Sequence, residues 1–291
     1  MANAWSQSTH EAYSSGLLVW HVHCDKKVVP ESLHVPAHHS HITSFVASLA
    51  GSYSGSTISN YLYGLRAWHL LHSIEWKLNI LKMEALLKGA ARLAPDSSTR
   101  KPCQPYTPEF ITKIGENLNL TLPLDAAVFA CLTDGFYSVV HVGELTVPWL
   151  NAFDPARHIT PINLRIEANQ NGMEVTILHI PHTKAAPLEC EDIYWSQQPG
   201  PTDPYEALEN HQCVNNPGDN DHLFAYLHKS HLRPLTKHTF IKQIADAACT
   251  AGLEHLQGHG IRIGATLFYL LQGVPFEAVK VMGQWSSDAF L

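Results

Sequence analysis

The chain has 291 residues, of which 45% are hydrophobic and 15% charged, enough apolar material for two ordinary cores and too much for wholesale disorder. Its longest apolar runs, Gly16 to Trp20 and Leu267 to Leu271, are too short to cross a bilayer, and no basic-then-apolar leader opens the sequence. The composition therefore predicts a soluble intracellular protein with no membrane partner.

The charge is divided unevenly along the chain. Residues 1–100 carry eight Lys and Arg against six Asp and Glu, whereas residues 101–291 carry eleven against twenty. Nucleic-acid affinity comes largely from Lys and Arg that release counterions from phosphate, so an acidic C-terminal part is a poor general binder of polyanions. Any nucleic-acid-binding function must therefore depend on a local group of cations.

The spacing of cysteine and histidine does not indicate a zinc module. The six cysteines form no C-x-x-C pair and are too sparse for a secreted disulfide scaffold, so we expect reduced thiols that lie mostly in the core. Two histidine clusters, His21-x-His23-Cys24 and His38-His39-x-His41, lack the spacing and the partner half of a closed tetrahedral site. We predict no metal site and no cofactor.

The first hundred residues are predicted to be helical. Apolar residues recur with a helical period from Ser56 to Trp76, where Ser56 and Thr57 are placed to cap the start, and again from about Asn79 to Leu93. Two shorter helices are expected near Glu11 to Cys24 and His41 to Leu49. These elements predict an all-helical N-terminal domain.

A proline-rich stretch separates this domain from the rest of the chain. Pro95 to Pro108 holds four prolines and two basic residues without an apolar period, which is typical of an exposed interdomain linker. The predicted organisation is a helical domain over 1–94, a linker over 95–108 and a second domain over 109–291.

The second domain is predicted to combine helices with a small antiparallel sheet. After a helix from Asp125 to Val140, two strand-like runs, Ile159 to Glu167 and Glu174 to Ile180, flank the turn Asn169 to Gly172, which is a hairpin signal. A Pro- and Asn-rich insertion is expected over roughly 196–220. Residues 235–291 are predicted to be helical except around 257–260. The expected fold class is thus mainly α, with an all-helical first domain and an α+β second domain.

The string Gln257-Gly-His-Gly-Ile-Arg262 carries the clearest chemistry. His259 and Arg262 are three residues apart, so in a helical turn both side chains project from one face. Arginine offers a two-pronged charged donor, and histidine can donate a hydrogen bond or shuttle a proton, a pairing that suits an oxyanion or a phosphate. A satisfied surface pair is the plainer alternative.

With this string, the chain resembles the tyrosine recombinase (phage integrase, Cre-like) superfamily and is most similar to recombinase-like proteins of mushroom-forming fungi. The stretches that carry the resemblance include GAARLAPDSSTRKP at 89–102, DAAVFACLTDGFY at 125–137, GELTVPWLNAFDP at 143–155 and QGHGIRIGATLFYLLQGVPFEAVKVMGQWSSDAFL at 257–291. The resemblance implies a helical core-binding domain and a catalytic domain that clamp duplex DNA. It also implies metal-free DNA breaking and rejoining, an origin in a mobile element, and a nuclear location.

The resemblance also implies roles for individual residues. Lys184 corresponds to a hairpin lysine that would protonate the leaving oxygen, and His259 with Arg262 corresponds to the pair that neutralises charge on the phosphate. Trp285, or Gln284 beside it, occupies the position of a further His or Trp. Preorganised donors of this kind supply most of the stabilisation in phosphoryl transfer.

Two positions depart from the pattern of the family. His141 stands where the resemblance places an arginine, and histidine is shorter and only partly charged near neutral pH, so phosphate binding there should be weaker. The resemblance places the nucleophilic tyrosine about eight or nine residues beyond Trp285, whereas the sequence stops at Leu291 without it, and Tyr269 is expected to be a core residue instead. The resemblance therefore implies a recombinase that is impaired or inactive in this chain.

Local cations must outweigh the acidic surface if DNA is the partner. A basic stripe can do so where the Debye length is about 8 Å, although a solvated surface charge is the plainer alternative for each residue. The candidates are Lys77, Lys82, Lys88, Arg92, Arg100, Lys101, Lys237 and Lys242. The expected partner is double-stranded DNA, on which copies of the chain could assemble. The alternative is a protein-interaction module that keeps the fold without binding DNA.

Overall fold

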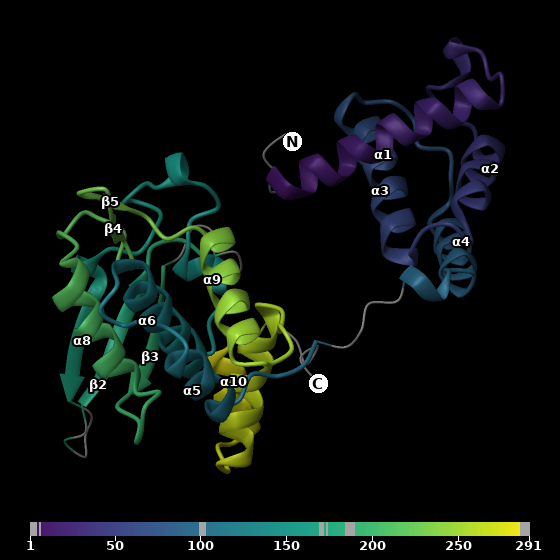
Figure 1. The fold of residues 1–291 in the computed structure, drawn as a ribbon. Coiled ribbons are helices and arrows are strands. Elements are labelled where there is room, and N and C mark those ends of the chain that lie inside the picture. The colour runs from purple at the N-terminus through teal and green to yellow at the C-terminus, as the bar shows by residue number, and fades with distance from the viewer. Residues whose placement is uncertain are drawn as a thin grey trace. The chain divides into compact units, whose positions relative to one another are not determined.

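The computed structural model describes residues 5, 7–98, 103–168, 172, 174–183 and 190–285. The chain divides into two compact units, Met1–Pro102 and Cys103–Leu291 (Figure 1). In the described part of the chain, none of the helices combines the length and apolarity that crossing a membrane requires.

The first unit is built from helices packed around one core. Trp20, Phe45, Ile58, Leu62 and Met83 are buried at its centre. Its helices are α1 (Gln7–Lys26), α2 (His39–Leu49), α3 (Gly55–Leu71) and α4 (Ile80–Arg92), with single 3-10 turns at Glu31–Leu33 and Asp96–Ser98.

Capping residues explain where α3 and α4 begin. Helix α4 begins where the sequence predicts, and Asn79 caps it, because its side-chain oxygen accepts a hydrogen bond of 2.8 Å from the Leu81 N–H. The predicted cap of α3 at Ser56 or Thr57 is wrong: Ser54 caps the helix, and its hydroxyl accepts from the Thr57 N–H at 3.1 Å. The helix also ends before the predicted Trp76, since Ser73 adopts a left-handed φ of 56° that an α-helix does not accommodate.

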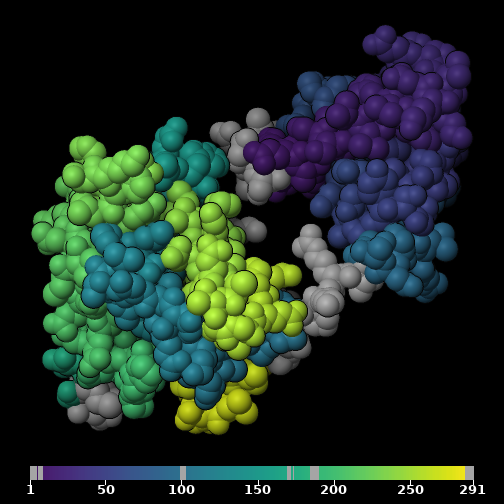
Figure 2. All heavy atoms as spheres, viewed as in Figure 1, coloured from purple at the N-terminus to yellow at the C-terminus, as the bar shows by residue number. Residues whose placement is uncertain are grey.

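The second unit surrounds α6 (Pro123–Tyr137), which is buried from Asp125 to Tyr137. This helix lies between α8 (Pro204–Asn215) and α9 (Lys237–Thr250) in Figure 1. Figure 2 shows that segments far apart in the sequence, coloured blue, green and yellow-green, lie side by side on one face of this unit. The other helices are α5 (Pro108–Glu116), α7 (Val142–Leu145), α8 (Pro204–Asn215), α9 (Lys237–Thr250), α10 (His259–Leu271) and α11 (Phe276–Met282).

The predicted hairpin is confirmed as part of a small antiparallel sheet. Strand β1 (Leu164–Ala168) pairs with β2 (Glu174–Ile180), and β2 pairs with β3 (Glu191–Ser196). A second pair joins β4 (Tyr226–His228) to β5 (His231–Arg233). The first strand begins later than the predicted Ile159, because Pro161–Asn163 form a 3-10 turn.

The Pro- and Asn-rich insertion over 196–220 contains a helix, α8, that the sequence analysis did not predict. Asp203 caps this helix by accepting from the Tyr205 N–H, and Pro204 occupies the first turn, where its missing N–H costs nothing. Ala207 and Leu208 are buried in the core of the unit. The helix was not predicted because proline and asparagine, which are typical of loops, stand at both ends of the segment.

The expectation of mostly core cysteines is also wrong. All six thiols are free, but only Cys24 and Cys131 are buried, whereas Cys190, Cys213 and Cys249 are exposed. Two of the exposed thiols lie on the outer faces of α8 and α9. Spacing along the chain carries no information about which side of a helix a cysteine occupies.

Candidate functional site

The start of α10 is held by a segment that crosses it closely. Tyr106 donates its backbone N–H to the Gly260 carbonyl at 3.0 Å and its hydroxyl to the Leu256 carbonyl at 3.2 Å. A Cβ atom at Gly260 or Gly264 would overlap the backbone of this segment. Two glycines one helical turn apart therefore fix the position of α10. Residues 103–107, part of the predicted linker, belong to the second unit.

Arg262 lies one turn into α10 and is only 5% exposed. Its guanidinium donates to the Gly283 carbonyl and lies 4.2 Å from the centroid of the Trp285 ring, a cation–π contact. Burial lowers the pKa of Arg262, and the Glu144 carboxylate opposes this shift. Arginine remains charged at neutral pH under such a shift because its ordinary pKa is so high.

His141 and His259 lie beside each other, although 117 positions separate them in the chain. Their ring centroids are 6.4 Å apart, their planes differ by 16°, and both side chains are exposed. His259 is the first residue of α10, and His141 directly precedes α7. Between α6 and α7, Val139 adopts a left-handed φ of 58°, which turns the chain there.

A turn after α11 brings Trp285 over Arg262. Gln284 adopts a left-handed φ of 54°, and the Trp285 N–H donates to the Lys280 carbonyl at 3.1 Å. Gly283 is required at this turn, because a Cβ atom there would overlap the Trp285 ring. The turn thus supplies both the carbonyl and the ring that hold the guanidinium.

We call His141, His259, Arg262 and Trp285 the His–Arg cluster. Of the residues singled out from the sequence, the structure brings these four together with Gln284. Lys184, Arg100 and Lys101 lie outside the described residues. The remaining cations are all exposed: Lys77, Lys82, Lys88 and Arg92 in the first unit, and Lys237 and Lys242 on α9 of the second.

The sequence analysis did not predict two groups that act on the Arg262 guanidinium, the Glu144 carboxylate and the Gly283 carbonyl. Glu144 is part of the string GELT, but that string alone does not indicate a carboxylate beside the guanidinium. The Gly283 carbonyl has no sequence signal at all. Within the described residues, no group of three His, Cys, Asp or Glu side chains is arranged to hold a metal ion.

Tyr269 is confirmed as a core residue. Its ring packs against the main core of the second unit, and its hydroxyl donates to the Tyr137 carbonyl at 2.7 Å. Burial raises the pKa of its phenol. A neutral phenol bonded to backbone is a poor nucleophile.

The cluster combines a permanent positive charge with two exposed ring donors. The Arg262 guanidinium lies below the surface and carries its charge into a region of reduced dielectric, where it acts more strongly than in water. The two imidazoles at the surface can each donate a hydrogen bond to an oxygen. This arrangement can bind one oxyanion group.

Comparison with known proteins identifies the fold. No protein-family model and no curated protein matches the sequence. Among solved structures, lambda integrase (75–356), crystallised as a dimer bound to a COC′ core site, aligns with a TM-score of 0.55 at 13% identity over 99% of this chain and 88% of its own. This match shows that the chain has the tyrosine recombinase fold, mainly helical with a small antiparallel sheet.

Two further solved recombinases align with lower scores. FLP recombinase in a Holliday junction complex gives a TM-score of 0.42 at 15% identity, covering 62% of this chain. The chain spans 44% of that FLP chain. XerA recombinase gives 0.42 at 14% identity over 86% of this chain and 90% of its own.

Proposed function

We propose that this protein binds double-stranded DNA and that the His–Arg cluster contacts a backbone phosphate. The observation that carries the proposal is the stacking of the exposed His141 ring on His259, the first residue of α10, one helical turn before Arg262. The fold shared with lambda integrase, which was crystallised on a DNA site, supports the same partner.

Each member of the cluster has a distinct part in this proposal. Trp285 and the Gly283 carbonyl fix the Arg262 guanidinium, so that its charge is preorganised before a phosphate arrives. His141 and His259 are exposed and make the first contacts with the phosphate oxygens. The exposed cations Lys237 and Lys242 on α9 add contacts to neighbouring phosphates.

We further propose that the cluster is better suited to holding a phosphate than to cleaving a DNA strand. His141 provides one ring donor, charged only when protonated, where the resemblance places a guanidinium fork. Loss of one preorganised donor commonly costs about 3 kcal/mol of barrier, roughly a hundredfold in rate. Lys184 would complete the donor set as a general acid.

We also propose an evolutionary origin for the protein. The strings at 89–102 and 257–291 support an origin among recombinase-like proteins carried by mobile elements in mushroom-forming fungi. A nuclear location and assembly of several copies on DNA follow from that origin.

The proposal is tested by measuring the affinity of the chain for a random-sequence duplex across a salt series. The double variant His141→Ala with His259→Ala should bind about tenfold more weakly, which corresponds to ~1.4 kcal/mol. His255→Ala removes another exposed histidine, four residues before His259, and should bind as the unmodified chain does. Equal affinity of all three proteins would disprove a phosphate contact at the cluster.

His141→Arg supplies the matching gain-of-function test. A guanidinium at this exposed position should strengthen binding and steepen the dependence of log K on log salt by about one unit. His255→Arg adds the same charge at an exposed position outside the cluster and serves as the control. If the slope of log K against log salt steepens equally in both variants, the added charge attracts DNA without a specific contact at the cluster.

The alternative function is a protein-interaction module without DNA binding. The excess of twenty acidic over eleven basic residues in 101–291 favours it, since such a surface repels a polyanion. Absence of duplex binding even at low salt would decide for this alternative.

A further inference from the structure

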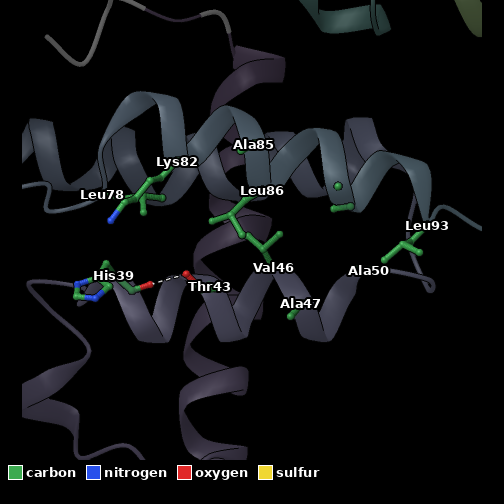
Figure 3. Close-up of a pocket in the computed structure, with 12 residues that line it drawn as sticks. His39, Thr43, Val46, Ala47, Ala50, Leu78, Lys82, Ala85, Leu86 and Leu93 are labelled. Carbon is green, nitrogen blue, oxygen red and sulfur yellow. Dashed lines mark hydrogen bonds between the residues drawn. The ribbon is translucent and has the colours of Figure 1, made fainter.

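The first unit carries an open groove between α2 and α4, with a volume of about 490 Å³ (Figure 3). Small residues form much of both walls, among them Thr43 and Ala47 on α2 and Ala85 and Gly89 on α4. Within each helix these residues are four apart, so each wall is one stripe along its helix. Because the walls are low, another helix can approach closely along the groove.

The charge around this α2–α4 groove has one sign. His39 and Lys82 lie at the same end, and Leu93 lies at the opposite end (Figure 3). Among the lining residues that the structure describes, none is acidic. Arg92, next in sequence to the lining residue Leu93 and about 100° from it around α4, is also exposed and extends the positive rim beside the groove. Lys88 instead shares the face of Glu84.

The acidic residues of these two helices do not offset that rim. The sequence of α2 contains no Asp or Glu, and α4 contains only Glu84. Glu84 is two residues from Lys82, a rotation of about 200°, so it projects from the opposite face of α4. The groove is therefore apolar along its length and cationic at its rim.

We propose that the α2–α4 groove binds the apolar face of an acidic amphipathic helix from a partner protein. The wall from Lys82 to Leu93 is about 16 Å long, whereas three anchors at i, i+4 and i+7 span about 10 Å. Acidic residues on the flanks of such a helix would meet Lys82 and Arg92. A duplex would also be attracted by these cations but has no apolar face to fill the groove.

Gly89→Leu tests the groove without weakening the fold. A Cβ atom at Gly89 meets nothing within 4 Å, so the new side chain enters the groove. Leucine is also a better helix former than glycine, so α4 should not lose stability. Lys82→Glu reverses the charge at one end, and Glu84→Leu, on the opposite face, is the matched control.

The probe is a fluorescein-labelled 18-residue helical peptide with Leu and Ala on one face and Glu on the other, measured by fluorescence anisotropy with the full chain. The acidic peptide should bind, and Gly89→Leu and Lys82→Glu should each weaken binding at least tenfold while Glu84→Leu leaves it unchanged. A peptide with the same apolar face but Lys in place of Glu should not bind.

Several results would overturn the proposal. They are absence of binding at low salt, equal binding by all variants with melting temperatures unchanged, or equal binding of the acidic and basic peptides. Concentration-dependent self-association that Gly89→Leu abolishes would assign the groove to a second copy of the chain. Loss of duplex affinity in Gly89→Leu would assign it to DNA.

Discussion

Buried histidines show how single residues of this protein depend on their surroundings. His211 is fully buried, with its Nε2 bonded to the Leu223 carbonyl and its Nδ1 to the Asn215 amide. Burial lowers the pKa of His211 to about 4. The pKa of His222 falls to about 3, through burial and through the nearby His158 and His211. Both rings are neutral in the folded protein.

His211 should therefore contribute a loss of stability to the second unit on acidification. Because the pKa of His211 is lower in the folded state than the ordinary 6.5, the unfolded chain binds more protons below that pH, and stability falls as the pH drops through 6.5. Between pH 7 and pH 5 the loss from His211 should be about 2 kcal/mol. Urea denaturation at the two pH values measures it.

His211→Gln provides the comparison, since glutamine keeps a donor and an acceptor but does not titrate. Its free energy of unfolding should change with pH by about 2 kcal/mol less than that of the unmodified chain. The exposed His238→Gln should keep the full pH dependence. Identical pH dependence in all three proteins would contradict a neutral His211.

At the scale of elements, the contact between α10 and residues 104–106 positions the candidate site. Gly260 and Gly264 let the two segments touch, and the Tyr106 N–H bonds to the Gly260 carbonyl. His259 and Arg262 lie on the same turns of α10 as these glycines. A change in this contact should therefore alter both the stability of the unit and the geometry of the His–Arg cluster.

Gly264→Ala should destabilise the second unit by about 1–3 kcal/mol, because the added methyl overlaps the Tyr106 backbone. This cost should exceed the gain of up to ~1 kcal/mol that alanine brings to a helix. Gly143→Ala, whose Cβ atom would meet nothing within 4 Å, is the control. Chemical denaturation that finds Gly264→Ala as stable as the control would disprove the close crossing.

The whole molecule contains two separate apolar cores. Met83 belongs to the core of the first unit and Ile111 to that of the second, and both side chains are almost fully buried. A core that is complete within its own unit can unfold as one cooperative transition.

Calorimetry of the full chain should accordingly show two transitions. Met83→Ala should lower the midpoint temperature of the first unit's transition only, and Ile111→Ala that of the second unit's transition only. Each variant should reduce the free energy of unfolding of its own unit by about 2–5 kcal/mol. A single transition shifted by both variants would mean that the two cores unfold together.

The sequence alone determined features that depend on neighbours along the chain. The helical period of α3 and α4 and the hairpin of β1 and β2 are local patterns, and the structure confirms them. The two-core organisation follows from the amount of apolar material. The pair of His259 and Arg262 on one face of α10 also needs only local spacing.

Only the tertiary structure decided which distant residues meet. His141 beside His259, Glu144 acting on Arg262, and the Gly283 carbonyl bound to the guanidinium all join segments far apart in the chain. The helix α8 and the strand β3 were likewise missed, because their signals depend on burial against α6 and β2. Packing selects such contacts through side-chain shape and desolvation, which a one-dimensional pattern does not contain.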